Sequence, residues 1–349
     1  MIKPIKLKRG DCVATISLSN GMAGEKIFRH RYELGKKRLE QDFGLRVAET
    51  KNSLNGIKYL SEHPEKRAKD LMSAFENPEI KAIISNIGGD DTIRLLPYID
   101  FNIIHNNPKI FIGYSDTTVN HFMMYKAGVV SYYGPAVMSE FAENCKMHDY
   151  TKKYIKEVLF DNKDRITIES SLEWTSELLD WCDQSNNNIY RKMNKEKHGY
   201  ELIQGKTIFE GMLLGGCIDV FPMIIGTEIW PKKEEWKNKI LYLETSENEV
   251  RPTFIEYILR NLIVQGIIDK INGIIVGKPK NEKYYEEYKE VYHRLIGKEA
   301  KRPDLPILFN VNFGHTSPMC ILPNGIKVRV DFNNKEIIFL ERPMSDSIS

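Results

Sequence analysis

Short apolar runs alternate with amphipathic segments through the first 160 residues of the chain. The apolar runs lie at 13–18, 45–48, 82–85, 110–113 and 129–133. Between two of them, apolar residues recur at three- and four-residue spacing, at Ala68, Leu71, Met72 and Phe75, as in a helix that packs on a sheet. Strands that alternate with such helices predict a mostly parallel sheet covered on both faces.

The segment 161–205 breaks this pattern. It mixes charges, consecutive asparagines and two tryptophans, with no sustained period. A connection of this length in a compact protein is usually functional or disordered, and the tryptophans favour a function. We therefore expect a loop excursion with one helix at most.

The alternation resumes after residue 206. Strands are predicted at 207–209, 240–243, 274–276 and 307–311, and helices at 218–225, 254–264 and 284–295. Residues 327–331 and 336–340 alternate around two asparagines, which indicates an antiparallel hairpin. The fold class predicted is α/β: a parallel-sheet N-terminal domain over 1–160, the excursion over 161–205, and a smaller C-terminal α/β domain with an antiparallel hairpin over 206–349.

Composition and charge narrow the class of protein. Hydrophobic residues make up 42% and charged residues 28%, and 50 basic side chains nearly balance 48 acidic ones. This is ordinary globular usage without a general attraction to nucleic acid or anionic lipid. We find no apolar run long enough for a membrane span, no signal-peptide pattern and no CxxC pair among the five cysteines. We expect a cytoplasmic protein that needs no metal or cofactor.

The strongest local feature is KIFIGYSDTT, an apolar strand that runs into a turn and then a helical pattern. Ser115 lies on the turn. A sharp strand-to-helix turn exposes a serine hydroxyl and aims the following backbone N–H groups at the same point, as in a nucleophile elbow. Thr117 replaces the second glycine of that motif. Taken alone, Ser115 fits better as a helix N-cap, because capping serines far outnumber catalytic ones.

Three other candidates follow predicted strands. Gly88 and Gly89 let backbone amides approach a developing oxyanion, so the N–H groups of Gly89 and Asp116 are oxyanion-hole candidates. Glu244 ends an apolar strand, where a carboxylate needs a partner, and His315 follows another. Each has an ordinary alternative: a tight turn, a capping acid and a structural histidine. Because ligand sites form at the carboxyl ends of strands, we expect the residues to meet there.

Serine, histidine and glutamate supply the three roles of a hydrolytic triad. The imidazole takes the proton of the hydroxyl, and the carboxylate orients the imidazole. The ordered motifs IGGDDTIRLLPYID, FIGYSDTT, EGMLLGGCIDVFPMIIGT, LYLETSE and NFGHTSPMCILPNG resemble those of the LD-carboxypeptidase family of serine peptidases over nearly the whole chain. Cys217 departs from the family pattern, which has asparagine after the two glycines.

The resemblance implies a fold and a site. It implies an N-terminal domain like the class I glutamine amidotransferases (flavodoxin-like), a triad of Ser115, Glu244 and His315 at the domain junction, and oxyanion donors at Gly89 and Asp116. Family members are commonly homodimers, and the same is expected here. Asp90, Asp91 and Arg94 lie next to the glycine pair and stay outside the catalytic set.

The excursion decides between two branches of the family. It carries Trp174 and Trp181 seven residues apart, on one face if the segment is helical. The microcin C self-immunity branch is similar in having such an insertion, whose aromatic side chains stack on a nucleobase. The resemblance therefore implies a substrate that is a peptidyl- or aminoacyl-nucleotide, bound by Gly88, Trp174 and Trp181, and a role in antibiotic self-immunity or detoxification. The alternatives are removal of a terminal D-amino acid from murein tetrapeptides, a non-catalytic nucleotide or peptide binder, and tryptophans that only pin the excursion to the core.

Overall fold

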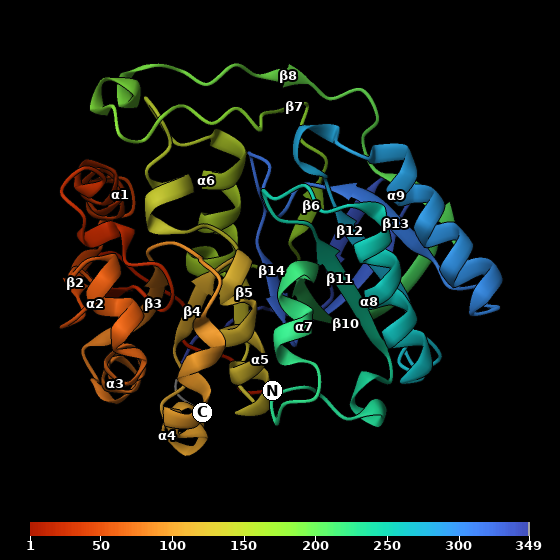
Figure 1. The fold of residues 1–349 in the computed structure, drawn as a ribbon, viewed down its shortest axis with the longest axis horizontal. Coiled ribbons are helices and arrows are strands. Elements are labelled where there is room, and N and C mark those ends of the chain that lie inside the picture. Colours follow the sequence, from red (N-terminus) through yellow and green to blue (C-terminus); the bar gives the residue numbers. More distant parts are fainter. Residues whose placement is uncertain (348–349) are drawn as a thin grey trace.

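The chain folds around two mixed sheets that lie side by side (Figure 1). The computed structural model describes residues 1–347. The first sheet has six strands in the order β14 (Leu322–Asn324), β5 (Ser131–Tyr133), β4 (Ile110–Gly113), β3 (Ile80–Ser85), β1 (Cys12–Ile16) and β2 (Arg46–Glu49). All its pairings are parallel except that of β14 with β5. The parallel sheet predicted for the first domain is confirmed.

Helices cover both faces of the first sheet. They are α1 (Arg29–Gln41), α2 (Ile57–Glu62), α3 (Pro64–Glu76), α4 (Phe101–Asn106), α5 (Thr118–Lys126) and α6 (Asp149–Lys156). Alternate residues of a strand point to opposite faces. In β1, Ala14 therefore packs in one core with α3 and α5, whereas Val13 packs in the other with α1 and α6.

The second sheet has eight strands. Their order is β6 (Thr167–Glu169), β16 (Glu336–Phe339), β15 (Lys327–Asp331), β10 (Ile208–Cys217), β11 (Lys239–Glu244), β12 (Gly273–Gly277), β13 (Ile307–Val311) and β9 (Glu201–Gln204). The strands from β10 to β13 are parallel, and the outer pairings are antiparallel. The predicted hairpin is β15–β16. The helices of this half are α7 (Phe221–Ile224), α8 (Pro252–Val264) and α9 (Tyr285–Tyr292).

The segment 161–205 differs from the expected loop. It supplies β6 and β9 to opposite edges of the second sheet, and between them it passes above both halves of the molecule as the two-stranded ladder of β7 (Glu173–Trp174) and β8 (Asn194–Lys195) (Figure 1). Trp174 lies on β7 and Trp181 on a turn, so the two do not share a helix face. Strand β10 also runs eight residues beyond its predicted end, because the sequence GMLLGGC continues the pairing with β11.

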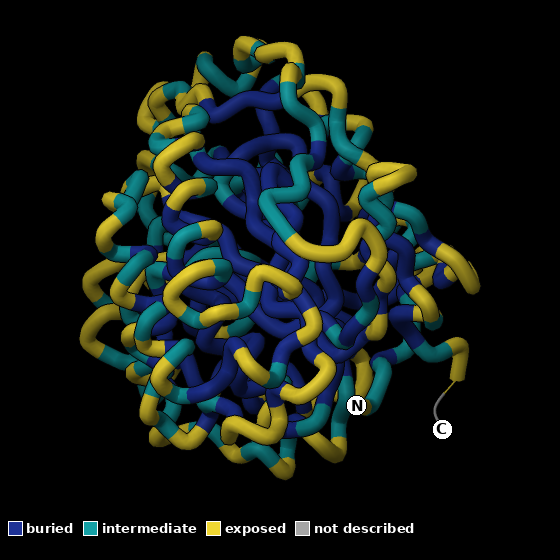
Figure 2. Tube along the Cα trace, turned by 90° about the vertical axis from the view of Figure 1, so that its right-hand side faces the viewer, coloured by how far each residue is buried: buried dark blue, intermediate teal, exposed yellow. Residues whose placement is uncertain are grey.

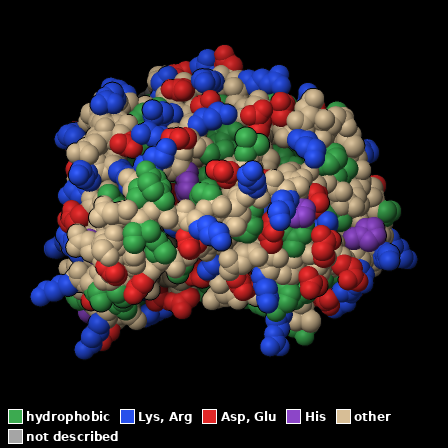
Figure 3. Space-filling model, turned by 90° about the horizontal axis from the view of Figure 1, so that it is seen from above, with side chains coloured by type: hydrophobic (Ala, Val, Ile, Leu, Met, Phe, Trp, Pro, Cys, Tyr) green, Lys and Arg blue, Asp and Glu red, His purple; other side chains and the backbone are tan. Residues whose placement is uncertain are grey.

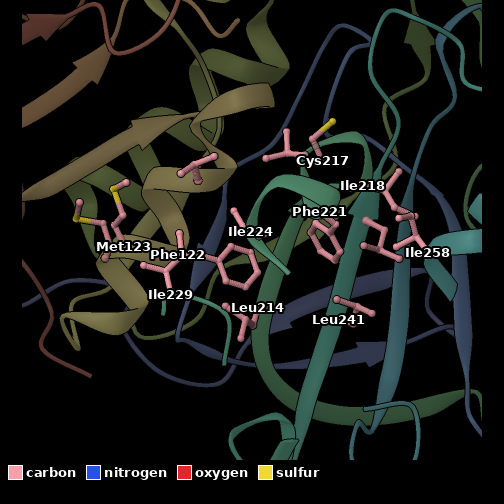
Figure 4. Close-up of a cluster of buried hydrophobic side chains, with 14 of the residues drawn as sticks. Phe122, Met123, Leu214, Cys217, Ile218, Phe221, Ile224, Ile229, Leu241 and Ile258 are labelled. Atoms are coloured by element: carbon pink, nitrogen blue, oxygen red, sulfur yellow. The ribbon is translucent and has the colours of Figure 1, made fainter. Parts of the chain in front are cut away.

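Both halves contribute to each of the two hydrophobic cores, which form the buried centre in Figure 2. In one of these cores, Phe122 and Met123 of α5 face Phe221, Ile224 and Ile229 of the C-terminal half (Figure 4). The rings of Phe122 and Phe221 lie 5.9 Å apart, edge to face. In addition, β14 from the C-terminal half pairs with β5 of the first sheet. This packing holds the carboxyl ends of β4 and β11 in fixed relative positions. Within residues 1–347, no helix has both the length and the apolar character needed to cross a membrane.

Candidate active site

Ser115 lies just beyond the carboxyl end of β4, on a 3-10 turn that leads into α5. Its φ of +62° is in the left-handed region, which costs energy for a residue other than glycine. The N-cap of α5 is Thr117, so the alternative that Ser115 caps this helix does not describe the structure. A strained serine on a strand-to-helix turn is the geometry of a nucleophile elbow.

The glycine loop after β3 runs along the serine side chain. A Cβ at Gly88 would lie 2.9 Å from the Cβ of Ser115, 3.1 Å from its Oγ and 3.4 Å from the amide nitrogen of Asp116. Gly89 has a φ of +147°, and a Cβ there would lie 2.2 Å from Ser19 Oγ. Neither position has room for a side chain. The glycines therefore bring main chain beside both the hydroxyl and the Asp116 amide.

The carboxyl group of Asp116 ties this loop to the elbow. Its Oδ2 accepts hydrogen bonds from the N–H and the hydroxyl of Thr92, at 2.9 and 2.6 Å. Burial raises the pKa of Asp116, although the bonds from Thr92 act in the opposite direction. The side chain is thus structural, and only the main-chain amide is available to a ligand beside Ser115.

Glu244 connects the elbow to His315. It is the last residue of β11 and is 1% exposed. Its Oε2 lies 2.8 Å from His315 Nδ1, and its Oε1 accepts a 2.5 Å hydrogen bond from the hydroxyl of Tyr133. That hydroxyl accepts in turn from the N–H of Ser115, at 3.0 Å. A continuous chain of hydrogen bonds therefore runs from Ser115 through Tyr133 and Glu244 to His315.

The imidazole of His315 lies between two carboxylates. Its Nε2 is 3.0 Å from Oε2 of Glu247, and the ring packs edge-on to Tyr114 with centroids 5.1 Å apart. Burial lowers the pKa of His315, but Glu244 and Glu247 outweigh it and raise the pKa to about 10. The hydrogen bond to His315 lowers the pKa of Glu247 to about 2. The ring is therefore an imidazolium in this arrangement.

Ser115 and His315 open onto the same cavity, which has a volume of about 610 Å³. Gly88, Gly89 and Glu247 line the end near these two residues. The other end is lined by Phe28, which directly precedes α1, by Arg31 of α1, and by residues of the excursion that include Leu178, Trp181 and Arg191. Seen from above, basic and acidic side chains are interspersed over the face that the excursion crosses, and hydrophobic side chains gather near its middle (Figure 3). The cavity has the size of sites that hold a nucleotide-sized ligand.

The two tryptophans have different surroundings. Trp181 lines the cavity, and the guanidinium carbon of Arg31 lies 4.7 Å from the centre of its ring. Trp174 is 6% exposed and is absent from the cavity lining, and its ring lies 4.4 Å from the Nζ of Lys278. The structure therefore brings Trp181 to the cavity, where it also packs against the hydrophobic core, whereas Trp174 is buried against Lys278 and does not line the cavity.

Asp91 and Arg94 belong to a structural ion-pair cluster. Asp91 lies 2.6 Å from Arg67 and 2.9 Å from Arg94. The main-chain N–H groups of Asp90 and Asp91 both donate to Ser19 Oγ. These contacts hold the glycine loop in place, and none of the residues that make them lines the cavity.

Sequence reasoning missed Tyr133 and Glu247. Tyr133 lies within an apolar strand and carries no mark that separates it from a packing tyrosine. Glu247 follows Glu244 by three residues, beyond the same strand end. A second acidic residue beyond this strand end was the feature of the sequence that could have identified Glu247.

Two family models match the chain. Residues 13–134 match the LD-carboxypeptidase N-terminal domain, and residues 210–330 match the LD-carboxypeptidase C-terminal domain. The fold and these matches define a serine peptidase. The chain belongs to the LD-carboxypeptidase family, peptidase family S66.

Curated relatives carry two kinds of name. The chain is 33% identical to the microcin C7 self-immunity protein MccF of Escherichia coli, over 82% of this chain and 81% of that one. It is 31% identical to the putative carboxypeptidase YocD of Bacillus subtilis, over 93% and 95%. It is 27% identical to a probable murein peptide carboxypeptidase of the same organism, over 96% and 93%.

Two solved structures with the same fold hold ligands that contain adenosine. An MccF-like protein from Streptococcus pneumoniae in complex with AMP superposes with a TM-score of 0.87, at 34% identity over 95% of this chain and 98% of that one. MccF in complex with aspartyl sulfamoyl adenosine superposes with a TM-score of 0.84, at 28% identity over 99% and 100%.

Proposed function

We propose that this protein is a serine peptidase that hydrolyses the amide bond between an aminoacyl or peptidyl group and a modified nucleotide. The observation that carries the proposal is the Glu244–His315 pair beside a strained Ser115, with both Ser115 and His315 on one nucleotide-sized cavity. The biological result would be self-immunity to, or detoxification of, aminoacyl-nucleotide antibiotics. We further propose that the enzyme acts in the cytoplasm as a homodimer.

The proposed chemistry uses Ser115 as nucleophile. Its Oγ attacks the carbonyl carbon and passes its proton to His315 Nε2, while Glu244 stabilises the imidazolium through Nδ1. The N–H groups of Gly89 and Asp116 stabilise the tetrahedral oxyanion. The carbon–nitrogen bond then breaks as His315 protonates the leaving nitrogen, and a water molecule, activated by the same imidazole, hydrolyses the acyl-enzyme to release the acid. This route requires Nε2 to be free of Glu247.

The nucleotide part of the substrate is proposed to lie at the Trp181 end of the cavity. Trp181 offers an aromatic face, and stacking of a base on such a face contributes on the order of 1–3 kcal/mol. The AMP and aspartyl sulfamoyl adenosine bound by the related proteins support a nucleoside as part of the substrate.

Turnover of two substrates tests the proposal. We expect the enzyme to cleave an aminoacyl sulfamoyl adenosine, and the Ser115→Ala variant to lose about a millionfold in kcat. If only a murein tetrapeptide is cut, the nucleotide specificity is wrong. If Ser115→Ala stays within about tenfold of wild type, the nucleophile is wrong.

The same experiment can also reveal either of two alternative functions. Similarity to a probable murein peptide carboxypeptidase favours removal of a terminal D-amino acid from murein tetrapeptides as the second candidate. A non-catalytic binder is the third. A serine-directed fluorophosphonate separates the third from the others, because a binder would leave Ser115 unlabelled.

A further inference from the structure

Glu247 occupies the position that the proposed mechanism needs to be empty. Its Oε2 lies 3.0 Å from His315 Nε2, the nitrogen that must accept the proton of Ser115. The side chain of Glu247 is 58% exposed and lines the cavity beside Ser115 and Gly88. An imidazole that donates this hydrogen bond has no lone pair for a hydroxyl proton. Glu247 must therefore leave Nε2 before the reaction can begin.

The loop that carries Glu247 is anchored, so its carboxylate stays near the reacting atoms. Ser246 is buried, and its hydroxyl donates to Asp219. The N–H of Asn248 donates to Ser246 Oγ at 3.1 Å, and the N–H of Glu249 donates to the Ser246 carbonyl at 3.2 Å. These bonds fix the main chain on both sides of Glu247, and only its side chain is free to move between the imidazole and the cavity.

The identity of the group that draws Glu247 away follows from where the substrate must lie. With Ser115 Oγ poised to attack, the carbonyl carbon lies beside Nε2, and the α-carbon of the acyl residue is bonded directly to that carbon. In an aminoacyl group the α-carbon carries an ammonium. That cation then comes within reach of the Glu247 carboxylate, and it can form charge-assisted hydrogen bonds with it.

We infer that Glu247 binds the free α-ammonium group of the aminoacyl part of the substrate. Once Glu247 has left Nε2 of His315, the imidazolium loses its Nε2 proton to water, and the neutral ring acts as the base. The inference rests on the proposed function and adds a specificity to it. The enzyme would prefer acyl residues whose α-nitrogen is a free amine over those whose α-nitrogen is acylated, as it is inside a peptide.

The exposure of Glu247 and the charges around it support a change of its partner from the imidazolium to the substrate ammonium. An ion pair with one member more than half exposed is weakly held in water, so a substrate cation can displace the imidazolium. Lys280 also lines the cavity, and its charge acts on Glu247. Glu247 in turn is one of the two carboxylates that raise the pKa of His315. Its departure therefore frees Nε2 and lowers the pKa of His315, so that more of the ring is in the neutral form that can accept a proton at neutral pH.

Two substrates and three variants test the inference. The substrates are an aminoacyl sulfamoyl adenosine with a free α-amine and the same compound N-acetylated on that amine. We expect wild type to prefer the free amine in kcat/KM by about tenfold or more, and Glu247→Gln to lose most of that preference. Glu247→Asp keeps the charge and should keep much of the preference. Glu249→Gln removes a carboxylate from the same loop, outside the cavity lining, and should behave as wild type.

The outcomes separate this inference from the proposed function. Glu247→Gln could instead change kcat/KM for both substrates by the same factor. Glu247 would then have a structural role, or its carboxylate would move from His315 to Lys280 without contacting the substrate amine. Either result overturns the inference while the proposed function stands. If wild type cleaves neither nucleoside, the proposed function fails and the inference fails with it. Fluorophosphonate labelling of Ser115 in Glu247→Gln shows whether the variant has folded with an intact elbow.

Discussion

The hydroxyl of Tyr133 joins the two halves of the candidate site, because it donates to Glu244 Oε1 at 2.5 Å and accepts from the N–H of Ser115 at 3.0 Å. Tyr133 lies on β5 of the first sheet, and Glu244 ends β11 of the second. One buried oxygen therefore fixes the serine turn relative to the carboxylate that holds His315. Burial first, and the charge of Glu244 second, raise the pKa of Tyr133 well above its usual range, so the hydroxyl remains a donor.

Replacement of Tyr133 by phenylalanine should lower activity through geometry. Without the hydroxyl, Ser115 N–H and Glu244 Oε1 each lose a buried partner. We expect kcat to fall by about ten- to a hundredfold, since a displacement of about 1 Å among reacting groups has that effect. The matched control is Tyr132→Phe, because the Tyr132 hydroxyl is also buried and donates to the Pro343 carbonyl at 2.8 Å, away from the cavity.

Tyr132→Phe should lose about 1–3 kcal/mol of stability for its one unpaired buried group, and Tyr133→Phe, which leaves two groups unpaired, should lose at least as much. Denaturant unfolding measures that loss, and steady-state kinetics measure kcat. Equal kcat values in the two variants would show that the Tyr133 bridge does not position the site.

The pH dependence of kcat/KM should show how the carboxylates of Glu244 and Glu247 raise the pKa of His315. The pKa of His315 is raised to about 10 in the free enzyme, so the ring stays protonated up to alkaline pH and the neutral base accumulates only above it. We therefore expect kcat/KM of wild type to rise with pH through the alkaline range. Because Glu247 contributes to this shift, Glu247→Gln should move the acid limb down by about one pH unit or more.

Other groups near His315 also affect the pKa of its ring and therefore the pH dependence of kcat/KM. Glu244 remains paired with Nδ1 in both proteins, and the Tyr114 ring packs against the imidazole. Burial raises the pKa of Asp219 to about 6, and its charge interacts with His315. An acid limb at the same pH in wild type and Glu247→Gln would show that Glu247 does not control the protonation of the ring.

Much of the fold could be predicted because it follows from the period of apolar residues. The predicted strand at 110–113 and the first strand of the hairpin at 327–331 have the same limits in the structure. The predictions failed for β6 and β9, since these short edge strands are only partly buried and leave little apolar pattern. They also failed at β10, where three glycines conceal a continuous strand that packs closely on β11.

In the candidate site, too, some residues could be predicted from the sequence and others could not. Ser115, Glu244 and His315 each stand at the end of a recognisable apolar strand. The strand before Ser115 belongs to the first sheet and the other two to the second, so packing between the two halves brings these strand ends together. Tyr133 could not be chosen over its neighbour Tyr132, because both are buried aromatic residues in one strand and differ only in the partner of the hydroxyl. Glu247 is an exposed acid among 48 acidic residues, and its significance depends on the exact place of one imidazole nitrogen.

The two tryptophans should respond differently to replacement by alanine. Trp181 lines the cavity with Arg31 against its ring, so it offers a face to a nucleobase. We expect Trp181→Ala to raise KM for an aminoacyl sulfamoyl adenosine by about five- to a hundredfold with little change in kcat, since stacking contributes about 1–3 kcal/mol. Trp174 packs on Lys278, which is fully buried and paired with Glu196 and Glu282. Trp174→Ala should therefore lower the free energy of unfolding, by about 3–5 kcal/mol, more than it changes KM. Kinetics and denaturant unfolding of both variants check this assignment, and a rise in KM for Trp174→Ala alone would reverse it.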